Sequence, residues 1–221
     1  YGEGETLVNA LDGVSLSLNE GRIYVILGPS GSGKSTLLNM IGGLDSLDSG
    51  EITIADRNIS GSDKKKLIDY RREDVGFVFQ FYNLIPDLTV QENIEVVSDI
   101  SKNPLDIEEV MTALDIEKYR NRFPKELSGG QQQRAAIARA LIKNPKILLC
   151  DELTGALDSK SSRSVLKFIE KINEQFKTTI IIITHNEAIA DMADSVIRIK
   201  DGRIADYTEN SHKLSAGELA L

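Results

Sequence analysis

The sequence contains no tryptophan, only two histidines and a single cysteine, Cys150. One cysteine excludes a disulfide within the chain, and no cysteine–histidine pair has the spacing of a metal site. Because Cys150 stands in an apolar run, we expect it to behave as a small buried apolar side chain. This cysteine usage fits a reducing compartment.

Long apolar runs and a basic excess are also missing. No segment approaches the roughly 18–20 apolar residues that span a bilayer, and the N-terminus lacks a secretory signal pattern. We therefore expect the chain neither to cross a membrane nor to be exported by that route, although docking on membrane proteins stays open. The 34 acidic and 26 basic residues give a net charge of −8. This balance argues against a broad polyanion-binding surface and predicts no nucleic-acid partner.

The residues that are present predict a single α/β domain. A chain of 221 residues with 41% hydrophobic content can bury a sizeable core. Strand-like runs alternate with helical periodicity, and their continuous β-branched character is typical of parallel strands covered on both faces. The predicted core strands are 22–27, 75–80, 146–150 and 178–184, and residues 51–56 alternate as a half-buried antiparallel strand does.

Helical periodicity predicts two helices beside these strands. The first follows the strand at 22–27, and its apolar face carries Leu37, Leu38, Ile41 and Leu44. The second carries Val165, Phe168, Ile169, Ile172 and Phe176. Near the end of the chain, Asp201-Gly202 predicts the tight turn of a β-hairpin.

We divide the single domain of residues 1–221 by these patterns. Residues 1–85 and 128–207 form the predicted core, and a helical insertion punctuated by prolines occupies 86–127. The polar tail at 208–221 receives no role. Because the first residue is Tyr1 and not Met, we expect the chain to continue from a longer protein with a preceding edge strand.

A glycine-rich turn stands between the first strand and the first helix. It reads GPSGSGKST and matches the pattern G-x-x-x-x-G-K-[ST] in the expected context. Its glycines let backbone N–H groups point at phosphate oxygens, and the helix N-terminus adds partial positive charge. Lys34 is placed to reach the β- and γ-phosphates, and Ser35 to ligate Mg²⁺. The predicted nucleotide contacts in this loop are Gly28, Ser30, Gly31, Ser32, Gly33, Lys34, Ser35 and Thr36.

A later buried strand ends in two carboxylates, Asp151 and Glu152. At the carboxyl end of a parallel strand, Asp151 lies beside the phosphate loop, where it can hold Mg²⁺. Successive strand residues point to opposite faces. Glu152 is therefore predicted to polarise a water molecule in line with the γ-phosphate.

A second glycine turn, LSGGQ at residues 127–131, opens another helix far along the chain. Ser128 can cap this helix, whose N-terminus also attracts anions. Two anion-binding helix starts in one chain indicate that ATP is held between two copies of the chain.

Taken together, these motifs resemble the nucleotide-binding subunit of ATP-binding cassette (ABC) transporters. The resemblance runs from Tyr1 to about Arg203, in the order GPSGSGKST, the glutamine of VGFVFQ, LSGGQQQR, ILLCDE, GALD and the histidine of IITH. The segments FVFQFYNLIPDLTVQENI and LSGGQQQRAAIARAL resemble the lipoprotein-release, macrolide-export, cell-division and peptide-resistance ATPases. The resemblance implies a RecA-like P-loop NTPase fold, a parallel core sheet with an N-terminal antiparallel β subdomain and a helical subdomain insertion.

The resemblance also assigns individual roles. Tyr1 corresponds to the aromatic residue that stacks on adenine, and Gln80 to the glutamine that ligates Mg²⁺ and senses the attacking water. His185 corresponds to the histidine that contacts the γ-phosphate and holds Glu152 in place. The residues that would reach the nucleotide of the opposite copy are Ser128, Gly129, Gly130, Gln131 and Asp158.

Two features depart from the family pattern. Leu153 stands where the family usually has proline after the catalytic glutamate. The loss of a fixed φ angle is expected to loosen that turn, although no reactive group is lost. The insertion before LSGGQ is also short, which can alter the surface offered to a membrane partner.

The favoured hypothesis is an ATPase that dimerises around two MgATP and drives integral membrane permease subunits through the Gln80–Leu84 region. Such a subunit lies on the cytoplasmic face of the cell membrane. An alternative keeps the ATP clamp but relays a signal to an extracytoplasmic partner without moving substrate. A soluble cassette ATPase of DNA repair or translation and a simple phosphate-loop kinase are disfavoured, since they leave the acidic charge or the LSGGQ turn unexplained.

Overall fold

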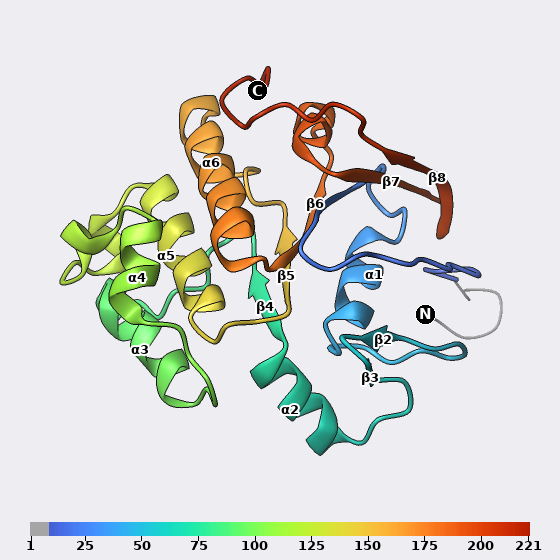
Figure 1. Cartoon of the computed structure of the whole chain (residues 1–221), viewed down its shortest axis with the longest axis horizontal. Coiled ribbons are helices and arrows are strands. Elements are labelled where there is room, and N and C mark those ends of the chain that lie inside the picture. Colours follow the sequence, from blue (N-terminus) through green and yellow to red (C-terminus); the bar gives the residue numbers. More distant parts are fainter. Residues whose placement is uncertain (1–8) are drawn as a thin grey trace.

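The structure is a computed structural model that describes residues 9–221 (Figure 1). Its main sheet has six strands in the order β4-β5-β6-β1-β7-β8. The first five of these run parallel, and β8 pairs antiparallel with β7. This confirms the predicted α/β class with a parallel core. The strands are β1 Ile23–Leu27, β4 Val75–Val78, β5 Ile147–Asp151, β6 Thr179–Thr184, β7 Ser195–Lys200 and β8 Arg203–Glu209.

Helices cover both faces of this sheet, as the apolar character of its strands predicts. All six residues of β6 are buried. Ile181 and Ile183 pack in the cluster on the α1 side, whereas Ile180 and Ile182 pack in the cluster that includes α3 to α6. Figure 1 shows α5 and α6 on one side of the sheet and α1 on the other. The helices are α1 Lys34–Ile41, α2 Lys64–Glu73, α3 Val90–Asp99, α4 Ile107–Ala113, α5 Gly129–Leu141 and α6 Ser159–Phe176.

The first helix ends earlier than its periodicity predicts. Leu37, Leu38 and Ile41 are buried as expected, but Leu44 lies beyond the helix and is 50% exposed. Gly43 adopts a φ of +64°, and the N–H of Leu44 donates to the carbonyl of Asn39 at 2.8 Å. This is a Schellman ending, which a glycine in the left-handed conformation favours. The prediction that Leu44 belongs to the apolar face was therefore wrong.

The predicted strand at 51–56 is also shorter in the structure. Only β2 Thr53–Ile54 and β3 Arg57–Asn58 pair, as a small antiparallel hairpin. Ala55 and Asp56 have φ angles of +46° and +64°, which suit a primed two-residue turn that ends the strand. Among the described residues, this hairpin is the antiparallel part outside the main sheet.

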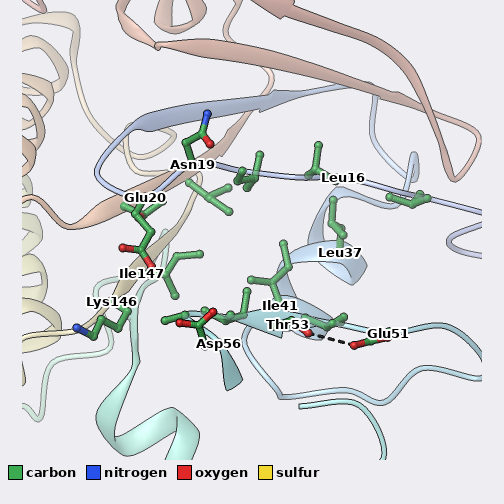
Figure 2. A pocket seen from close by; sticks show the side chains of 17 residues that line it. Leu16, Asn19, Glu20, Leu37, Ile41, Glu51, Thr53, Asp56, Lys146 and Ile147 are labelled. Atoms are coloured by element: carbon green, nitrogen blue, oxygen red, sulfur yellow. Dashed lines mark hydrogen bonds between the residues drawn. The ribbon is translucent and has the colours of Figure 1, made fainter. Parts of the chain in front are cut away.

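An apolar pocket of about 370 Å³ lies between this hairpin, α1 and the extended segment 14–20. Leu16, Leu37 and Ile41 point into it, while Glu20 and Lys146 lie at one end (Figure 2). Residues of the phosphate loop do not line this pocket. It is therefore separate from the site described below.

Residues 86–127 contain the short helices α3 and α4 and two 3₁₀ turns, Glu117–Tyr119 and Pro124–Glu126. Thr89 and Glu92 form a capping box at the start of α3, and Asp106 caps α4. These caps satisfy backbone N–H groups that a short helix otherwise leaves without partners.

The end of the chain has a structural role that we did not assign. The hairpin turn at Asp201-Gly202 is confirmed, with φ angles of +49° and +73°. Beyond β8, Ala216 and Leu219 are buried against the core that includes α6. The N–H of Ala216 donates to Glu170 at 2.8 Å. The tail therefore packs along α6. Within residues 9–221, no helix is long and apolar enough to cross a membrane.

Candidate functional site

The phosphate loop connects the end of β1 to the start of α1. Gly33 is the N-cap of α1 and has a φ of +103°, a conformation that side chains strongly disfavour. A Cβ at this position would lie 2.4 Å from the carbonyl oxygen of Ala10. The sequence requirement for glycine here thus has a steric cause.

Two side chains give this loop the character of an anion site. Lys34 donates from its Nζ to the carbonyls of Gly28 and Pro29, at 2.7 and 2.9 Å. The Oγ of Ser32 is buried without a hydrogen-bond partner among the described residues. A buried hydroxyl that lacks a partner is costly. An ammonium group and an orphaned hydroxyl at a helix N-terminus fit a phosphate group.

Part of the predicted site, namely most of the phosphate loop with Asp151, Glu152 and His185, lines one cavity of about 630 Å³. Residues 30–36 form one wall, and Asp151, Glu152 and His185 form part of another. These side chains follow β1, β5 and β6, which are neighbours in the sheet. Because parallel strands end at the same edge, residues far apart in the sequence are brought together.

Asp151 stands at the carboxyl end of β5 and is half-buried. Burial and the neighbouring charge of Glu152 raise its pKa, while the ammonium group of Lys34 lowers it. In the part of the chain that the structure describes, no group of three or more histidine, cysteine, aspartate or glutamate side chains is arranged so that it could hold a metal ion by itself. One carboxylate beside the hydroxyl of Ser35 suits Mg²⁺, which retains waters and shares phosphate oxygens.

Glu152 is held in an unusual backbone conformation, with a φ of +49°. Its N–H donates to the carbonyl of Ile183 at 3.0 Å, and Thr184 donates from Oγ1 to its carboxylate at 3.4 Å. The Nδ1 of His185 lies 3.0 Å from the other carboxylate oxygen. Strained residues cluster at functional sites when their surroundings fix them, and here one neighbour holds the backbone of Glu152 and two hold its carboxylate.

The chain immediately around Glu152 is anchored by apolar side chains. Leu153 is 2% exposed in the core, and Cys150 is fully buried. Burial raises the pKa of the Cys150 thiol, which confirms its expected character as an apolar side chain. The side chain of Leu153, which stands in place of the family's proline, packs in the core instead.

Gln80 lies two residues beyond the end of β4, not at the end of the strand as predicted. Its amide rests on Gly155, in the loop after Glu152. A Cβ at Gly155 would lie 2.9 Å from the Nε2 of Gln80. The side chain of Gln80 therefore contacts the loop that follows Glu152, although Gln80 does not line the cavity.

The second glycine turn lies apart from the cavity. Ser128 caps α5, and its backbone N–H donates to the side-chain oxygen of Gln131 at 2.8 Å. Asp158 caps α6 by accepting from the N–H of Ser161 at 3.0 Å, and backbone and hydroxyl donors of Ser161 lower its pKa. A Cβ on Gly130 would lie 3.3 Å from the Cβ of Ser161. The starts of α5 and α6 thus form one surface, and neither Ser128–Gln131 nor Asp158 lines the cavity.

Several residues at the site were not predicted. Thr184 contacts Glu152, and the hairpin turn reaches the phosphate loop because the N–H of Gly202 donates to the carbonyl of Ser32 at 3.0 Å. Asp201-Gly202 was recognised only as a turn, and its place at the cavity has no signal in the sequence. Tyr1, the predicted adenine contact, lies outside the described residues.

Comparisons with known proteins agree with this geometry. The sequence profile of the family described as ABC transporter matches residues 11–155. The putative ABC transporter ATP-binding protein MG467 homolog of Mycoplasma pneumoniae is 46% identical over 197 residues, covering 88% of this chain and 58% of that protein. The macrolide export ATP-binding/permease protein MacB of Hyphomonas neptunium is 41% identical over 225 residues, covering 100% of this chain and 34% of that protein. The chain thus spans less than two thirds of the length of both relatives.

Solved structures give the same result over nearly the whole chain. The dimeric cassette MJ0796, whose sequence comes from Methanocaldococcus jannaschii, superposes with a TM-score of 0.83 at 41% identity, covering 95% of this chain and 94% of that chain. A dimeric post-hydrolysis state of the same cassette, bound to ADP and Pi, also gives a TM-score of 0.83, at 40% identity over 95% of this chain and 94% of that chain. By its sequence motifs, its fold and these relatives, the chain belongs to the ABC transporter family.

Proposed function

We propose that the chain is the ATP-hydrolysing subunit of a membrane ABC transporter. One observation carries the proposal: the phosphate loop, Asp151, Glu152 and His185 meet at a single cavity. A loop that binds phosphate needs only the first of these elements. The carboxylates and the histidine add the groups that hydrolysis of the γ-phosphate requires.

The proposed contacts with MgATP follow from this arrangement. The backbone of residues 28–33 surrounds the phosphates, and Lys34 exchanges its two carbonyl partners for phosphate oxygens. Ser35, Gln80 and Asp151 are the proposed magnesium ligands, directly or through water. When bound, Mg²⁺ supplies charge neutralisation to the phosphate oxygens.

Glu152 is the proposed residue that orients and activates the attacking water. If Nδ1 of His185 carries the proton, it donates a hydrogen bond to the Glu152 carboxylate, since the two atoms lie 3.0 Å apart. That hydrogen bond fixes the carboxylate and leaves the Nε2 of His185 to contact the γ-phosphate. The side chain of His185 is 75% exposed, so a second molecule can cover it.

We propose that this second molecule is another copy of the chain. Residues 128–131 and Asp158 do not line the cavity of their own chain. They lie where the N-termini of α5 and α6 meet. In an antiparallel dimer, they would reach the nucleotide held by the opposite phosphate loop. The dimeric state of the related cassette MJ0796 supports this arrangement.

The proposed membrane partner docks near the loop that follows β4. Phe81 is 75% exposed, and Ile85 in the same loop is 42% exposed. Exposed apolar side chains of this kind favour a protein partner, which we propose to be integral membrane permease subunits on the cytoplasmic side. The export function in the name of the MacB relative favours transport over signal relay without substrate movement.

Substitution of the catalytic carboxylate tests the proposal. In Glu152→Gln, ATP hydrolysis should fall at least hundredfold, while a dimer accumulates with MgATP because the clamp no longer opens. The matched control is Glu187→Gln, which removes an exposed carboxylate that pairs with Arg198 at 2.7 Å. Hydrolysis and size-exclusion elution are measured on both. A monomeric Glu152→Gln chain at saturating MgATP would contradict the two-copy site, and unchanged hydrolysis would contradict the role of Glu152.

A further inference from the structure

The loop after β4 contains a turn that its sequence does not favour. Tyr82 and Asn83 both have left-handed backbone conformations, with φ angles of +53° and +51°. Residues with a Cβ disfavour this region, tyrosine more than asparagine. Two such residues in succession therefore require a contact from elsewhere in the molecule.

Arg139, in the last turn of α5, supplies that contact. One terminal nitrogen of its guanidinium donates to the carbonyl of Asn83 at 2.5 Å, and the other donates to the carbonyl of Tyr82 at 3.1 Å. The guanidinium presents its donors as a rigid planar fork. It therefore fixes the relative orientation of two adjacent carbonyls, which is what defines this turn.

The same loop touches the other end of α5. A Cβ on Gly129, the first residue of that helix, would lie 2.8 Å from the hydroxyl oxygen of Tyr82. Gly129 and Arg139 are about 15 Å apart along the helix axis, at a rise of 1.5 Å per residue. The side chain of Tyr82 thus approaches the start of α5, whereas the backbone of the loop is hydrogen-bonded near the end of the helix by Arg139.

Beyond the turn, the chain is held by a different residue. Asn93 is fully buried, and its side chain exchanges hydrogen bonds with both backbone groups of Ile85 and donates to the carbonyl of Leu88. This separate attachment to α3 leaves Arg139 as the described side chain that bonds the carbonyls of Tyr82 and Asn83.

We propose that Arg139 is a positioning residue, which fixes the loop at residues 79–84 to α5. Gln80 and the exposed Phe81 then move as one body with the helix that begins at the second glycine turn. The inference rests on the proposed function for its consequence: closure of a partner's nucleotide against Ser128–Gln131 displaces the surface around Phe81. The attachment itself does not depend on nucleotide.

The absence of tryptophan from the sequence makes the loop easy to observe. Phe81→Trp, at a side chain that is 75% exposed, introduces a single reporter. In this reporter chain, Arg139→Met should lower the fluorescence anisotropy of the tryptophan without nucleotide, because the turn is released. It should lower kcat for ATP about tenfold and leave KM within about twofold, since the phosphate loop is untouched.

The matched control is Arg134→Met on the same helix. Arg134 donates to the backbone carbonyls of Leu114 and Asp115 at 3.0 and 3.1 Å, away from the loop after β4. This substitution should leave the anisotropy of the tryptophan at position 81 unchanged. Thermal melting of each variant shows whether the chain is folded.

A rescue separates positioning from general loss of packing. Asn83→Gly adopts the left-handed conformation without steric cost, so adding it to Arg139→Met should recover kcat at least threefold. Asn144→Gly, at a φ of +56° elsewhere, should not. Unchanged anisotropy in folded Arg139→Met overturns the inference, as does a rescue that both glycine substitutions give equally.

The transmitted movement is measured with MgATP. The emission of the tryptophan at position 81 should shift in the parent reporter, and the shift should shrink at least twofold in Arg139→Met although nucleotide still binds. A full shift in Arg139→Met, or none in the parent, overturns the coupling. Failure of the proposed function would instead be seen as absence of ATP hydrolysis in the unsubstituted chain, and the nucleotide-free anisotropy would still decide the role of Arg139.

Discussion

Substitution of Gly155 by alanine tests the position of Gln80 without removing any functional group. Gly155 does not have a positive φ angle, and a Cβ there would meet only the Nε2 of Gln80 at less than 3.0 Å. The substitution is therefore tolerated by the backbone. Its main effect is to displace one amide group.

The size of the effect follows from the contact distance. The amide of Gln80 must retreat by about 0.5 Å, from 2.9 Å to the 3.4 Å at which ordinary contact begins. A misplacement of about 1 Å in an active site can cost about hundredfold in rate. Half of that displacement predicts a decrease of about tenfold in kcat. Stability should rise by about 0.4–1 kcal/mol, because alanine reduces the conformational freedom of the unfolded chain.

The assay measures ATP hydrolysis against Mg²⁺ concentration, together with the free energy of unfolding in urea. Gly217→Ala is the matched control, because its Cβ would meet the flexible side chain of Lys167 at 3.2 Å, far from the cavity in the tail. In a Gln80→Ala background, Gly155→Ala should have no further effect on kcat. Full activity of Gly155→Ala, or an equal loss in both backgrounds, would refute the proposed role of the Gln80 amide.

Three further predictions concern charge and packing. Asp151→Asn should raise the free energy of unfolding at pH 7 by about 1 kcal/mol, because burial and the charge of Glu152 disfavour the ionised carboxylate. The same variant should lose magnesium-dependent ATP hydrolysis. A lower free energy of unfolding in urea would contradict this prediction. Burial lowers the pKa of Lys143 from 10.5 to about 8. As the pH rises from 8 to 10.5, the Lys143 ammonium group therefore loses its proton in the folded state before it does in the unfolded state, and the free energy of unfolding rises. Urea unfolding of Lys143→Met across that range should lack this rise. Leu219→Ala should cost about 2 kcal/mol of stability with little change in hydrolysis, since Leu219 is 2% exposed and distant from the cavity, and an unchanged unfolding midpoint would mean that the tail does not dock.

The strands were predicted within a few residues because their β-branched runs bury both faces. The prediction of 178–184 matches β6 from Thr179 to Thr184. The strand predicted at 75–80 is present but two residues shorter, since β4 ends at Val78 although Phe79 continues the strand-like pattern. Beyond β4, Arg139, far away in the sequence, binds the carbonyls of Tyr82 and Asn83 in the next turn. Tertiary contacts can thus override the local propensity for a strand, and no pattern in the neighbouring sequence predicts such contacts.

The site was predictable where chemistry demands particular side chains at fixed spacing. The placement of Lys34 and Asp151 at the cavity could be predicted because each belongs to a recognisable motif, Lys34 at the start of α1 and Asp151 at the end of β5. The contact of Gln80 with Gly155 could not, since it depends on the absence of a side chain. The hydrogen bond from the N–H of Gly202 to the carbonyl of Ser32 could not be predicted either, because only backbone groups form it.

The loop from Glu152 to Asp158 connects two surfaces that a single chain cannot bring together. Glu152 lines the cavity, whereas Asp158 caps α6 beside the start of α5. Six peptide units span at most about 20 Å, so a shift at one end is felt at the other. In the proposed dimer, each loop would join the hydrolytic carboxylate of one site to the helix starts that close the second site. Gln80 rests on the middle of this loop at Gly155, and its own loop is bound to α5 through Arg139. In the proposed dimer, occupancy of either nucleotide site would therefore be transmitted to the exposed surface at Phe81 through these backbone turns.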